Sequence, residues 1–331
     1  MLWFNAFDLL GPLDNSFRSD PIVGYSVKNI SDFGLDYLIH AYESSGFTAG
    51  AVGRACNLIE KMLADPEISI FMSLSGALIP AGQQKFLVEI VKSGRISGIV
   101  STGATLTHDY LEDLGFAHLP VGQHSSDADL RSRGINRIFD RMASDEGFIA
   151  MEKDIHVFLE ELVGKTGFKK SPLSTSTLLK HLGTRLSDRS LLGVAARSNT
   201  PIYCPAITDS ILGVHMMTFR EFNSDLLIDP LLELKMFVSQ CFDCKKTAAI
   251  VFGGGVPKNY LFQSMLTSGK ELSYAIQVTM DRPEHGGLSG ASLEEAISWG
   301  KIDSRAGLVT VMADVTLILP IFAQLFKKMR K

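Results

Sequence analysis

The sequence predicts one large α/β domain, in which a mostly parallel, Rossmann-like sheet is covered by helices on both faces. Apolar runs of strand length alternate with longer helical patterns, as in buried parallel sheets. The chain also contains no internal repeat, low-complexity linker or charge block that would divide it. We expect an N-terminal extension over residues 1–45 and the α/β domain over residues 46–331.

The expected strands are apolar runs separated by helical patterns. They cover residues 68–74, 96–102, 200–206, 247–254, 274–280 and 308–314. Residues 125–190 are expected to form a mostly helical lobe over the sheet. The apolar run 307–326 is long enough to cross a membrane. Because Asp314 and Pro320 interrupt it, a buried strand followed by a buried helix is the better interpretation.

Composition narrows the classes of function. Of the 331 residues, 46% are hydrophobic and 21% are charged, which supports a full core and does not indicate disorder. The net charge of −4 argues against a nucleic-acid groove as the main surface. The apolar N-terminus has no basic region and no small-residue cleavage site, so no signal peptide is predicted. We expect a soluble, cytoplasmic protein.

The chain has four cysteines, too few for a disulfide scaffold at this length. Cys241 and Cys244 form a single C-x-x-C. A zinc site needs a second pair at suitable spacing, and the sequence has none. We therefore interpret Cys241 and Cys244 as two residues on one face of a helix, and we predict no metal site.

The turns that follow the expected strands are rich in Gly, Ala, Ser and Thr. They cover residues 73–82, 101–109, 205–213, 252–259, 279–292 and 312–316. Small residues let the backbone approach a ligand, and a helix N-terminus beyond them favours phosphate. None fits G-x-G-x-x-G or the P-loop. Several such turns on one sheet edge predict a large ligand, and a dinucleotide fits; plain tight turns are the alternative.

The stretch GASLEEAISWGKIDS combines a short helical pattern with a lysine. Ser292 and Glu295 have capping-box spacing, and Gly300 is placed to end the helix in a left-handed conformation. Glu295 and Trp299 are four residues apart and share one helix face. A solvated Lys301 after a capped helix is the simpler interpretation. The alternative is a site for a cationic amine, with a carboxylate, an aromatic wall and a nucleophilic lysine.

Several motifs follow one another along the chain. They are RGINRI (133–138), PAITDS, GGGVPKN, PEHGGLSGASLEEAISWGKI and the strand that ends at Asp314. In this order they resemble the deoxyhypusine synthase family over roughly residues 35 to 326, and EAISWGK is the most specific motif. The turns STGATLTHD and PEHGGLSGA are more similar to the archaeal and bacterial branch than to the eukaryotic enzymes.

The resemblance implies NAD-dependent aminobutyl transfer. In this family NAD accepts a hydride from the carbon beside the secondary amine of spermidine. The motif lysine, here Lys301, attacks the resulting imine and diaminopropane leaves. An acceptor amine then takes the butylimine, and NADH reduces it. The acceptor is a lysine of the translation initiation factor 5A precursor in deoxyhypusine synthases, and putrescine in homospermidine synthases. The family forms homotetramers with active sites between paired subunits.

The resemblance also assigns site residues by position, with Lys301 as the catalytic residue. Cofactor binding is implied for Thr102, Gly103, Ala104, Asp209, Gly253, Gly254, Thr279, Asp314 and Val315. Amine binding is implied for Glu295, Trp299, Ser289, Gly286, Asn259 and His215. For Asp209 and Asp314, capping of the following helix is an equal alternative to accepting ribose hydroxyls.

The implied amine pocket departs from that of the eukaryotic enzymes. Val214, followed by His215, replaces an acidic residue, Asn259 replaces a histidine, and Leu288 replaces an aspartate. The pocket has therefore lost anionic groups, and the identity of the amine donor and acceptor stays open.

Three hypotheses remain at this point. The first is a deoxyhypusine synthase that modifies a protein lysine. The second is a homospermidine synthase with putrescine as acceptor. The third is a NAD-binding regulatory paralogue with an eroded amine pocket, against which intact Glu295, Trp299 and Lys301 argue.

Overall fold

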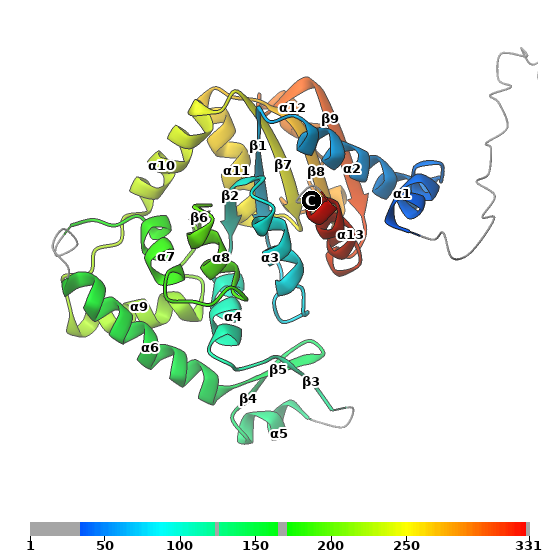
Figure 1. The fold of residues 1–331 in the computed structure, drawn as a ribbon. Coiled ribbons are helices and arrows are strands. Elements are labelled where there is room, and N and C mark those ends of the chain that lie inside the picture. The colour runs from blue at the N-terminus through cyan, green and yellow to red at the C-terminus, as the bar shows by residue number, and fades with distance from the viewer. Residues whose placement is uncertain (1–33, 123–125, 165–170, 329–331) are drawn as a thin grey trace, which may run out of the picture.

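The computed structural model describes residues 34–122, 126–164 and 171–328. Its centre is a six-stranded sheet of order β6-β2-β1-β7-β8-β9 (Figure 1). Every neighbouring pair in this sheet is parallel, as predicted. The strands are β1 (Ile68–Leu74), β2 (Ile96–Ser101), β6 (Ile202–Tyr203), β7 (Lys246–Phe252), β8 (Leu272–Thr279) and β9 (Ile302–Met312).

Helices cover both faces of this sheet, which confirms the predicted layers (Figure 1). Ile70 and Met72 of β1 belong to the larger core cluster, with α2 (Phe47–Ala64), α3 (Gln84–Lys92), α8 (Leu191–Arg197) and α13 (Val315–Lys328). Phe71 points the other way, toward α10 (Pro230–Asp243) and α11 (Gly255–Ser268). Successive side chains of a strand point to opposite faces, so the continuous apolar run serves two cores.

Two strands differ from the predicted bounds by three residues or more at one end. β6 has two residues instead of seven, because Pro201 and Pro205 flank it and a proline donates no ladder hydrogen bond. β9 begins at Ile302 rather than at residue 308, and Ile302 pairs with Leu272. The first part of β9 was not predicted because residues 303–305 are polar and do not extend the apolar run.

The lobe below the sheet, residues 125–190, is mostly helical as predicted, but the prediction missed its strands. It contains a small antiparallel sheet of order β3-β5-β4. The helices of the lobe and its surroundings are α4 (Gly103–Asp113), α5 (Asp127–Ser132), α6 (Asp145–Gly164), α7 (Thr175–Gly183) and α9 (Ile211–Phe222). Its strands are β3 (Leu119–Pro120), β4 (Ile135–Ile138) and β5 (Arg141–Ser144). These strands are short and largely not buried, so they lack the apolar run that marks a core strand.

The predicted N-terminal extension includes α1 (Leu35–Glu43), which packs on α2. Ile39 of α1 is buried in the main core. Gly53 of α2 permits this approach, because a Cβ there would lie 2.3 Å from the backbone nitrogen of Glu43. Residues 1–33, the rest of the predicted extension, lie outside the described residues.

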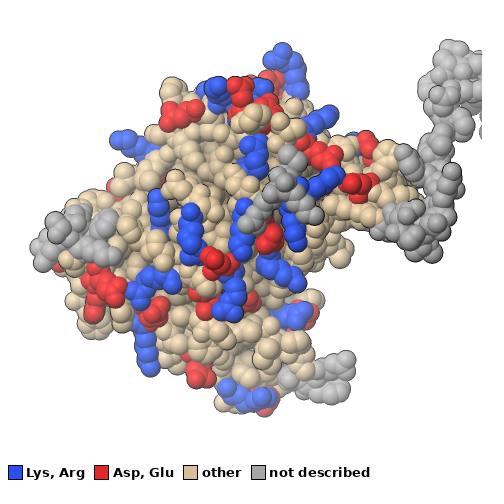
Figure 2. Space-filling view, in the orientation of Figure 1, with Lys and Arg blue, Asp and Glu red and all other residues tan. Residues whose placement is uncertain are grey.

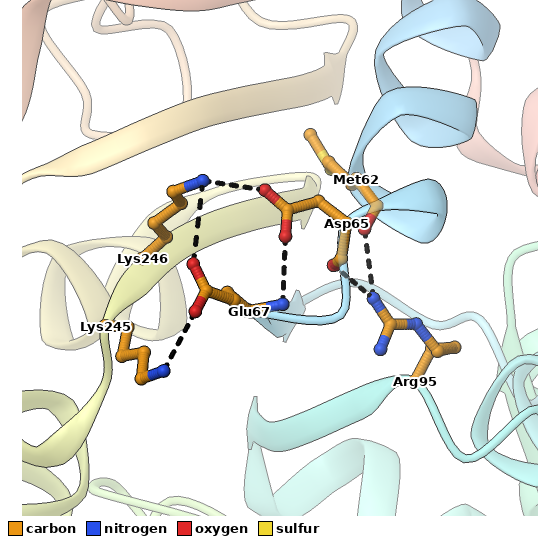
Figure 3. Close-up of polar contacts among 6 residues, drawn as sticks. All are labelled: Met62, Asp65, Glu67, Arg95, Lys245 and Lys246. Atoms are coloured by element: carbon orange, nitrogen blue, oxygen red, sulfur yellow. Dashed lines mark hydrogen bonds and ion pairs between the residues drawn. The ribbon is translucent and has the colours of Figure 1, made fainter.

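Charged side chains join the starts of three strands at the amino edge of the sheet (Figure 3). The carboxylate of Asp65 accepts from Nζ of Lys246 at 2.8 Å, and that of Glu67 accepts from Nζ of Lys245 at 2.8 Å. Arg95, before β2, donates to the backbone oxygen of Asp65 at 2.8 Å. Exposed pairs of this kind stabilise a fold by about 0–1 kcal/mol each, so they support the strand register without determining it.

The apolar run 307–326 divides into β9 and α13, as predicted. Among the described residues, no helix has the length and apolar character needed to cross a membrane. Acidic and basic side chains are interspersed on the face seen in Figure 2.

Candidate active site

A cavity of about 580 Å³ lies at the carboxyl ends of the strands, and we term it the carboxyl-edge cavity. The chain passes from β1 to β2 and β6 on one side, then returns to β7, β8 and β9 on the other. The crevice between β1 and β7 is therefore a topological switch point, where α/β sheets bind ligands. Segments that follow all six strands line the cavity.

Most of the residues predicted to bind a cofactor lie together here. Those that line the carboxyl-edge cavity are Thr102, Asp209, Gly253, Gly254, Thr279, Asp314 and Val315. Gly103 and Ala104 do not line it, because they begin α4 just beyond Thr102. A Cβ at Gly103 would lie 2.5 Å from Oγ of Ser210, so this glycine permits close packing of α4. Gly76 and Ala77 also line the cavity.

The turn from β7 to α11 forms a tight backbone cradle in this cavity. Gly253 has a φ of +81°, and a Cβ there would lie 2.3 Å from Oγ of Ser75. That hydroxyl accepts from the backbone N–H of Gly254 at 2.8 Å and donates to the oxygen of Phe252 at 3.1 Å. No side chain caps α11, whose first residues line the cavity. Its uncapped N–H groups suit a phosphate.

Two carboxylates that line this cavity, Asp209 and Asp314, follow the two outermost strands of the sheet, β6 and β9. Oδ1 of Asp314 accepts from the N–H and the hydroxyl of Thr316, both at 2.7 Å, so Asp314 does cap α13 while lining the cavity. Asp209 is different, because Ser210 caps α9 and the Asp209 carboxylate has no partner among the described residues. Asp209 therefore remains available to accept hydroxyl hydrogen bonds from a ligand.

A second cavity, of about 280 Å³, lies between α11 and the one-turn helix α12 (Glu295–Ser298), and we term it the lysine cavity. Nζ of Lys301 lies 5.2 Å from the ring centroid of Trp299. Glu295 and Asn259 line the same cavity. The structure thus brings together four predicted residues, the aromatic face, the carboxylate, the amide and the lysine.

Two backbone features position the side chains of Glu295, Trp299 and Lys301. Oγ of Ser292 accepts from the N–H of Glu295 at 3.2 Å, as predicted, although the helix is shorter than the predicted span 292–299. Gly300 is left-handed, with a φ of +66°. The N–H groups of Gly300 and Lys301 donate to the oxygens of Ile297 (2.9 Å) and Ala296 (3.1 Å). This pair of bonds is a Schellman motif, which reverses the chain and starts β9 at the lysine.

The remaining predicted amine residues lie elsewhere. Ser289 lines the carboxyl-edge cavity, where its Cα would lie 2.4 Å from a Cβ at Gly254. Gly286 forms a left-handed turn in the 281–292 loop and lines neither cavity. His215 was expected at the amine but is buried between α9 and α6, with Nδ1 3.8 Å from Oε1 of Glu152. It lines neither cavity because it faces inward on α9, and burial lowers the pKa of its imidazole.

Lys258 is a site residue that sequence reasoning missed. It is 4% exposed, and its Nζ donates to Oε1 of Gln277 (2.8 Å) and to the oxygens of Leu288 (3.2 Å) and Ala291 (2.5 Å). Burial lowers the pKa of this lysine to about 8, while the nearby Glu295 opposes the shift. The buried ammonium group holds the 281–292 loop against α11, between the two cavities.

Gln277 completes the connection, and sequence reasoning missed it too. Its Nε2 donates to the oxygens of Gly253 at 2.9 Å and Ser289 at 2.8 Å. The side chain therefore joins the cradle of the carboxyl-edge cavity to the loop that Lys258 holds. A glutamine inside the apolar strand YAIQVTM was the available signal, because a buried amide needs partners.

All four cysteines are free thiols. Among the described residues, no group of three or more His, Cys, Asp or Glu side chains is placed to hold a metal ion.

Comparison with known proteins agrees with this geometry. The family model for deoxyhypusine synthase matches residues 37–325. "Probable deoxyhypusine synthase 1" of Methanosarcina acetivorans is 38% identical over 302 residues, covering 91% of this chain and 92% of the relative. The protein of the same name from Archaeoglobus fulgidus is 38% identical over 284 residues, covering 86% and 90%.

A solved deoxyhypusine synthase structure from Entamoeba histolytica superposes with a TM-score of 0.63. It is 18% identical in sequence and covers 91% of this chain and 95% of its own, so it supports the fold alone. The family model and the archaeal relatives carry the assignment, since both extend over most of the sequence. The chain belongs to the deoxyhypusine synthase family.

Proposed function

We propose that this chain is a NAD-dependent aminobutyltransferase, which moves the four-carbon amine of spermidine to a lysine of the translation initiation factor 5A precursor. One observation carries the proposal. Lys301, Trp299 and Glu295 share a cavity next to the carboxyl-edge cavity, and both α11 and the 281–292 loop contribute residues to the two cavities. An amine site and a dinucleotide site in one chain are what such a transfer requires.

The carboxyl-edge cavity fits NAD on three counts. The cradle at Gly253 and Gly254 leaves no room for a Cβ, no side chain caps the start of α11, and the Asp209 carboxylate has no partner within the described part of the chain. The cradle and α11 would hold the pyrophosphate, and Asp209 and Asp314 would accept ribose hydroxyls. When bound, NAD would take up the hydride equivalent lost by the donor amine, and its reduced form would return that equivalent to the imine of the acceptor.

The residues of the lysine cavity have distinct tasks. The face of Trp299 and the carboxylate of Glu295 attract a protonated amine. Nζ of Lys301 forms a bond to the oxidised carbon, and the bond from that carbon to the leaving diamine breaks. The acceptor amine then attacks the same carbon and releases Lys301. Lys258 and Gln277 keep the intervening loop in position, so the two sites stay adjacent.

A homospermidine synthase is the second candidate, because the lysine cavity is poor in negative charge. Glu295 is the only carboxylate among the described residues that line it, against Lys258 and Lys301. Asn259 adds hydrogen-bonding capacity without charge. A small diamine acceptor such as putrescine needs fewer carboxylates than a longer polyamine, which favours this candidate.

The site is proposed to be completed by a second copy of the chain, within a homotetramer. Apolar side chains on the rims of both cavities are exposed to solvent: Met280 is 67% exposed, Val256 50% and Leu288 46%. Exposed apolar groups gathered around a site indicate a surface that is covered in the assembled protein. A partner subunit would also supply the carboxylates that the lysine cavity lacks.

The experiment combines NAD, labelled spermidine and one of two acceptors, the translation factor precursor or putrescine. We expect label in the protein band, whereas homospermidine would favour the second candidate. Borohydride reduction followed by peptide mapping should place the labelled adduct on Lys301. Lys301→Ala should abolish transfer, and Lys270→Ala, at a partly buried lysine that does not line the cavity, should not. An adduct on Lys258 would contradict the assignment of the nucleophile.

A further inference from the structure

A third cavity, of about 330 Å³, lies beside the carboxyl-edge cavity, and we term it the Arg220 cavity. It is bounded by α9, by the segment after β6 and by the chain that leads into α10. Its walls are largely apolar, and Ile207, Met216 and Leu226 are all buried. A cavity of this size with apolar walls and few polar groups is typical of a small-molecule site. Unbranched Met216 can adjust to the shape of an occupant.

The charge of this cavity restricts its ligand. Arg220 is the only ionisable side chain among the described residues that line it. Its guanidinium is exposed and makes no ion pair or hydrogen bond with the described residues. A cationic amine would meet a like charge here, whereas a carboxylate can pair with the guanidinium through two hydrogen bonds. One arginine among apolar walls therefore suits a ligand with a single negative charge and an apolar tail.

The wall of the Arg220 cavity is shared with the carboxyl-edge cavity. Pro205, Ile207 and Thr208 line the Arg220 cavity, while Ala206 and Asp209 line the other side. A five-residue segment therefore separates the two spaces. It also carries Asp209, the carboxylate that is free to accept hydrogen bonds from a ligand.

Close packing on several sides fixes this wall. A Cβ at Gly213 would lie 2.3 Å from the oxygen of Ile207, and one at Gly103 would lie 3.1 Å from the same oxygen. The N–H of Cys204, just before the wall, donates to Oε1 of Glu233 at 3.0 Å. An occupant of the Arg220 cavity would contact Ile207 and so add to the packing of the segment that carries Asp209.

We propose that the Arg220 cavity binds a small amphipathic monoanion, with its carboxylate on Arg220 and its tail against Ile207, Met216 and Leu226. Binding stabilises the 205–209 wall and thereby couples to the carboxyl-edge cavity. The site is separate from the amine and cofactor sites, and its occupancy can be measured without NAD or polyamine.

The test uses octanoate as the probe, with octan-1-ol and octylamine as charge controls, on the full chain without NAD. Ligand-observed NMR titration gives the dissociation constants. We expect octanoate to bind about tenfold more tightly than octanol, because its carboxylate forms charge-assisted hydrogen bonds with the guanidinium, and this ratio corresponds to about 1.4 kcal/mol. Any binding of octylamine should be independent of Arg220, because a like charge disfavours an amine in this cavity. Arg220→Gln should remove the preference for octanoate, and Arg220→Lys should retain part of it. Arg131→Gln, at an exposed arginine on α5, is the matched control and should change nothing.

Hydrogen exchange of the same samples tests the effect on the wall. Octanoate should slow the exchange of the backbone amides of residues 204–210 in the native chain, and should not do so in Arg220→Gln. Equal binding of octanoate and octanol would overturn the proposal, as would an Arg220→Gln variant that keeps the preference. Protection confined to other segments would also overturn it, because the tail would then lie elsewhere.

Discussion

Glu233 shows how one buried carboxyl can support a site that it does not touch. The side chain on α10 is fully buried, and its Oε1 accepts from the N–H of Cys204. Its Oε2 has no partner among the described residues. Burial raises the pKa of this carboxyl to about 7, although hydrogen bonds from Ser176 and Cys204 oppose the shift. Near neutral pH the group that anchors the 205–209 wall is therefore poised between two protonation states.

Replacing Glu233 should change how stability depends on pH. The folded-state pKa of about 7 lies above the ordinary glutamate value of 4.5, so the folded chain retains a proton that the unfolded chain loses. The wild type thus loses stability as pH rises from about 4.5 to about 7. Glu233→Gln has no such titration, and its amide oxygen still accepts from Cys204. From pH 5 to pH 8, we expect the variant to gain about 2.5 kcal/mol in unfolding free energy relative to wild type.

Urea unfolding at several pH values measures this difference. Glu221→Gln, at an exposed glutamate, controls for the loss of one charge. A difference between Glu233→Gln and wild type that stays constant from pH 5 to pH 8 would show that the folded carboxyl titrates in its ordinary range.

At the scale of elements, α12 contributes through its ends rather than its length. A single turn buries little, and only Ala296 of α12 is buried. The helix positions Lys301 through the Schellman motif at its C-terminus, because Gly300 turns the chain directly into Lys301 and β9. The position of the predicted nucleophile thus depends on one left-handed residue.

The variant Gly300→Ala tests whether the position of Lys301 depends on the left-handed conformation of residue 300. The nearest atoms to a Cβ at this position are 3.9 Å away, so the cost arises from the backbone conformation alone. We expect a loss of about 1 kcal/mol in unfolding free energy for Ala and a smaller loss for Asn, which tolerates left-handed φ. Gly46→Ala, at a glycine with negative φ and no atoms near its Cβ, is the control. Activity should fall more for Gly300→Ala than this stability change explains, because Lys301 shifts. Equal stability of the Ala and Asn variants would argue against strain at this residue.

The elements also show which parts could be predicted from the sequence. Long apolar strands and the Gly300 turn were visible as local patterns, and the structure contains them. The hairpin of β4 and β5 was not visible, since its short strands are mostly unburied and pair with each other. Lys258 and Gln277 were missed for a different reason. The glutamine inside an apolar strand was visible, but its contact with Lys258 joins residues 19 apart in sequence, and no local pattern encodes that pairing.

For the whole molecule, the strand order determines where chemistry can occur. The chain reverses its direction of growth between β1 and β7, so turns from both halves meet at one edge. The same edge carries exposed apolar side chains around both cavities, including Met280 and Leu288. Leu317, next to the cavity residue Thr316, is 70% exposed. A single chain leaves this edge open, and the proposed neighbouring subunit would close it.

Charge placed on this rim should therefore weaken assembly. Burying a methionine or leucine side chain contributes about 1.5–3 kcal/mol, and a lysine in its place adds a desolvation cost. We expect Met280→Lys with Leu317→Lys to raise the dissociation constant of the oligomer by about a hundredfold or more. Sedimentation velocity over a range of protein concentrations measures it.

The matched control is Leu231→Lys, because Leu231 is 74% exposed on α10 and lines none of the three cavities. It should leave the sedimentation of the protein unchanged, and all variants should show the circular dichroism of the folded chain. If the rim is an interface, the double variant should also lose dinucleotide affinity in proportion to the fraction of monomer. A wild-type chain that sediments as a monomer at all concentrations, yet transfers aminobutyl groups, would show instead that one chain completes the site alone.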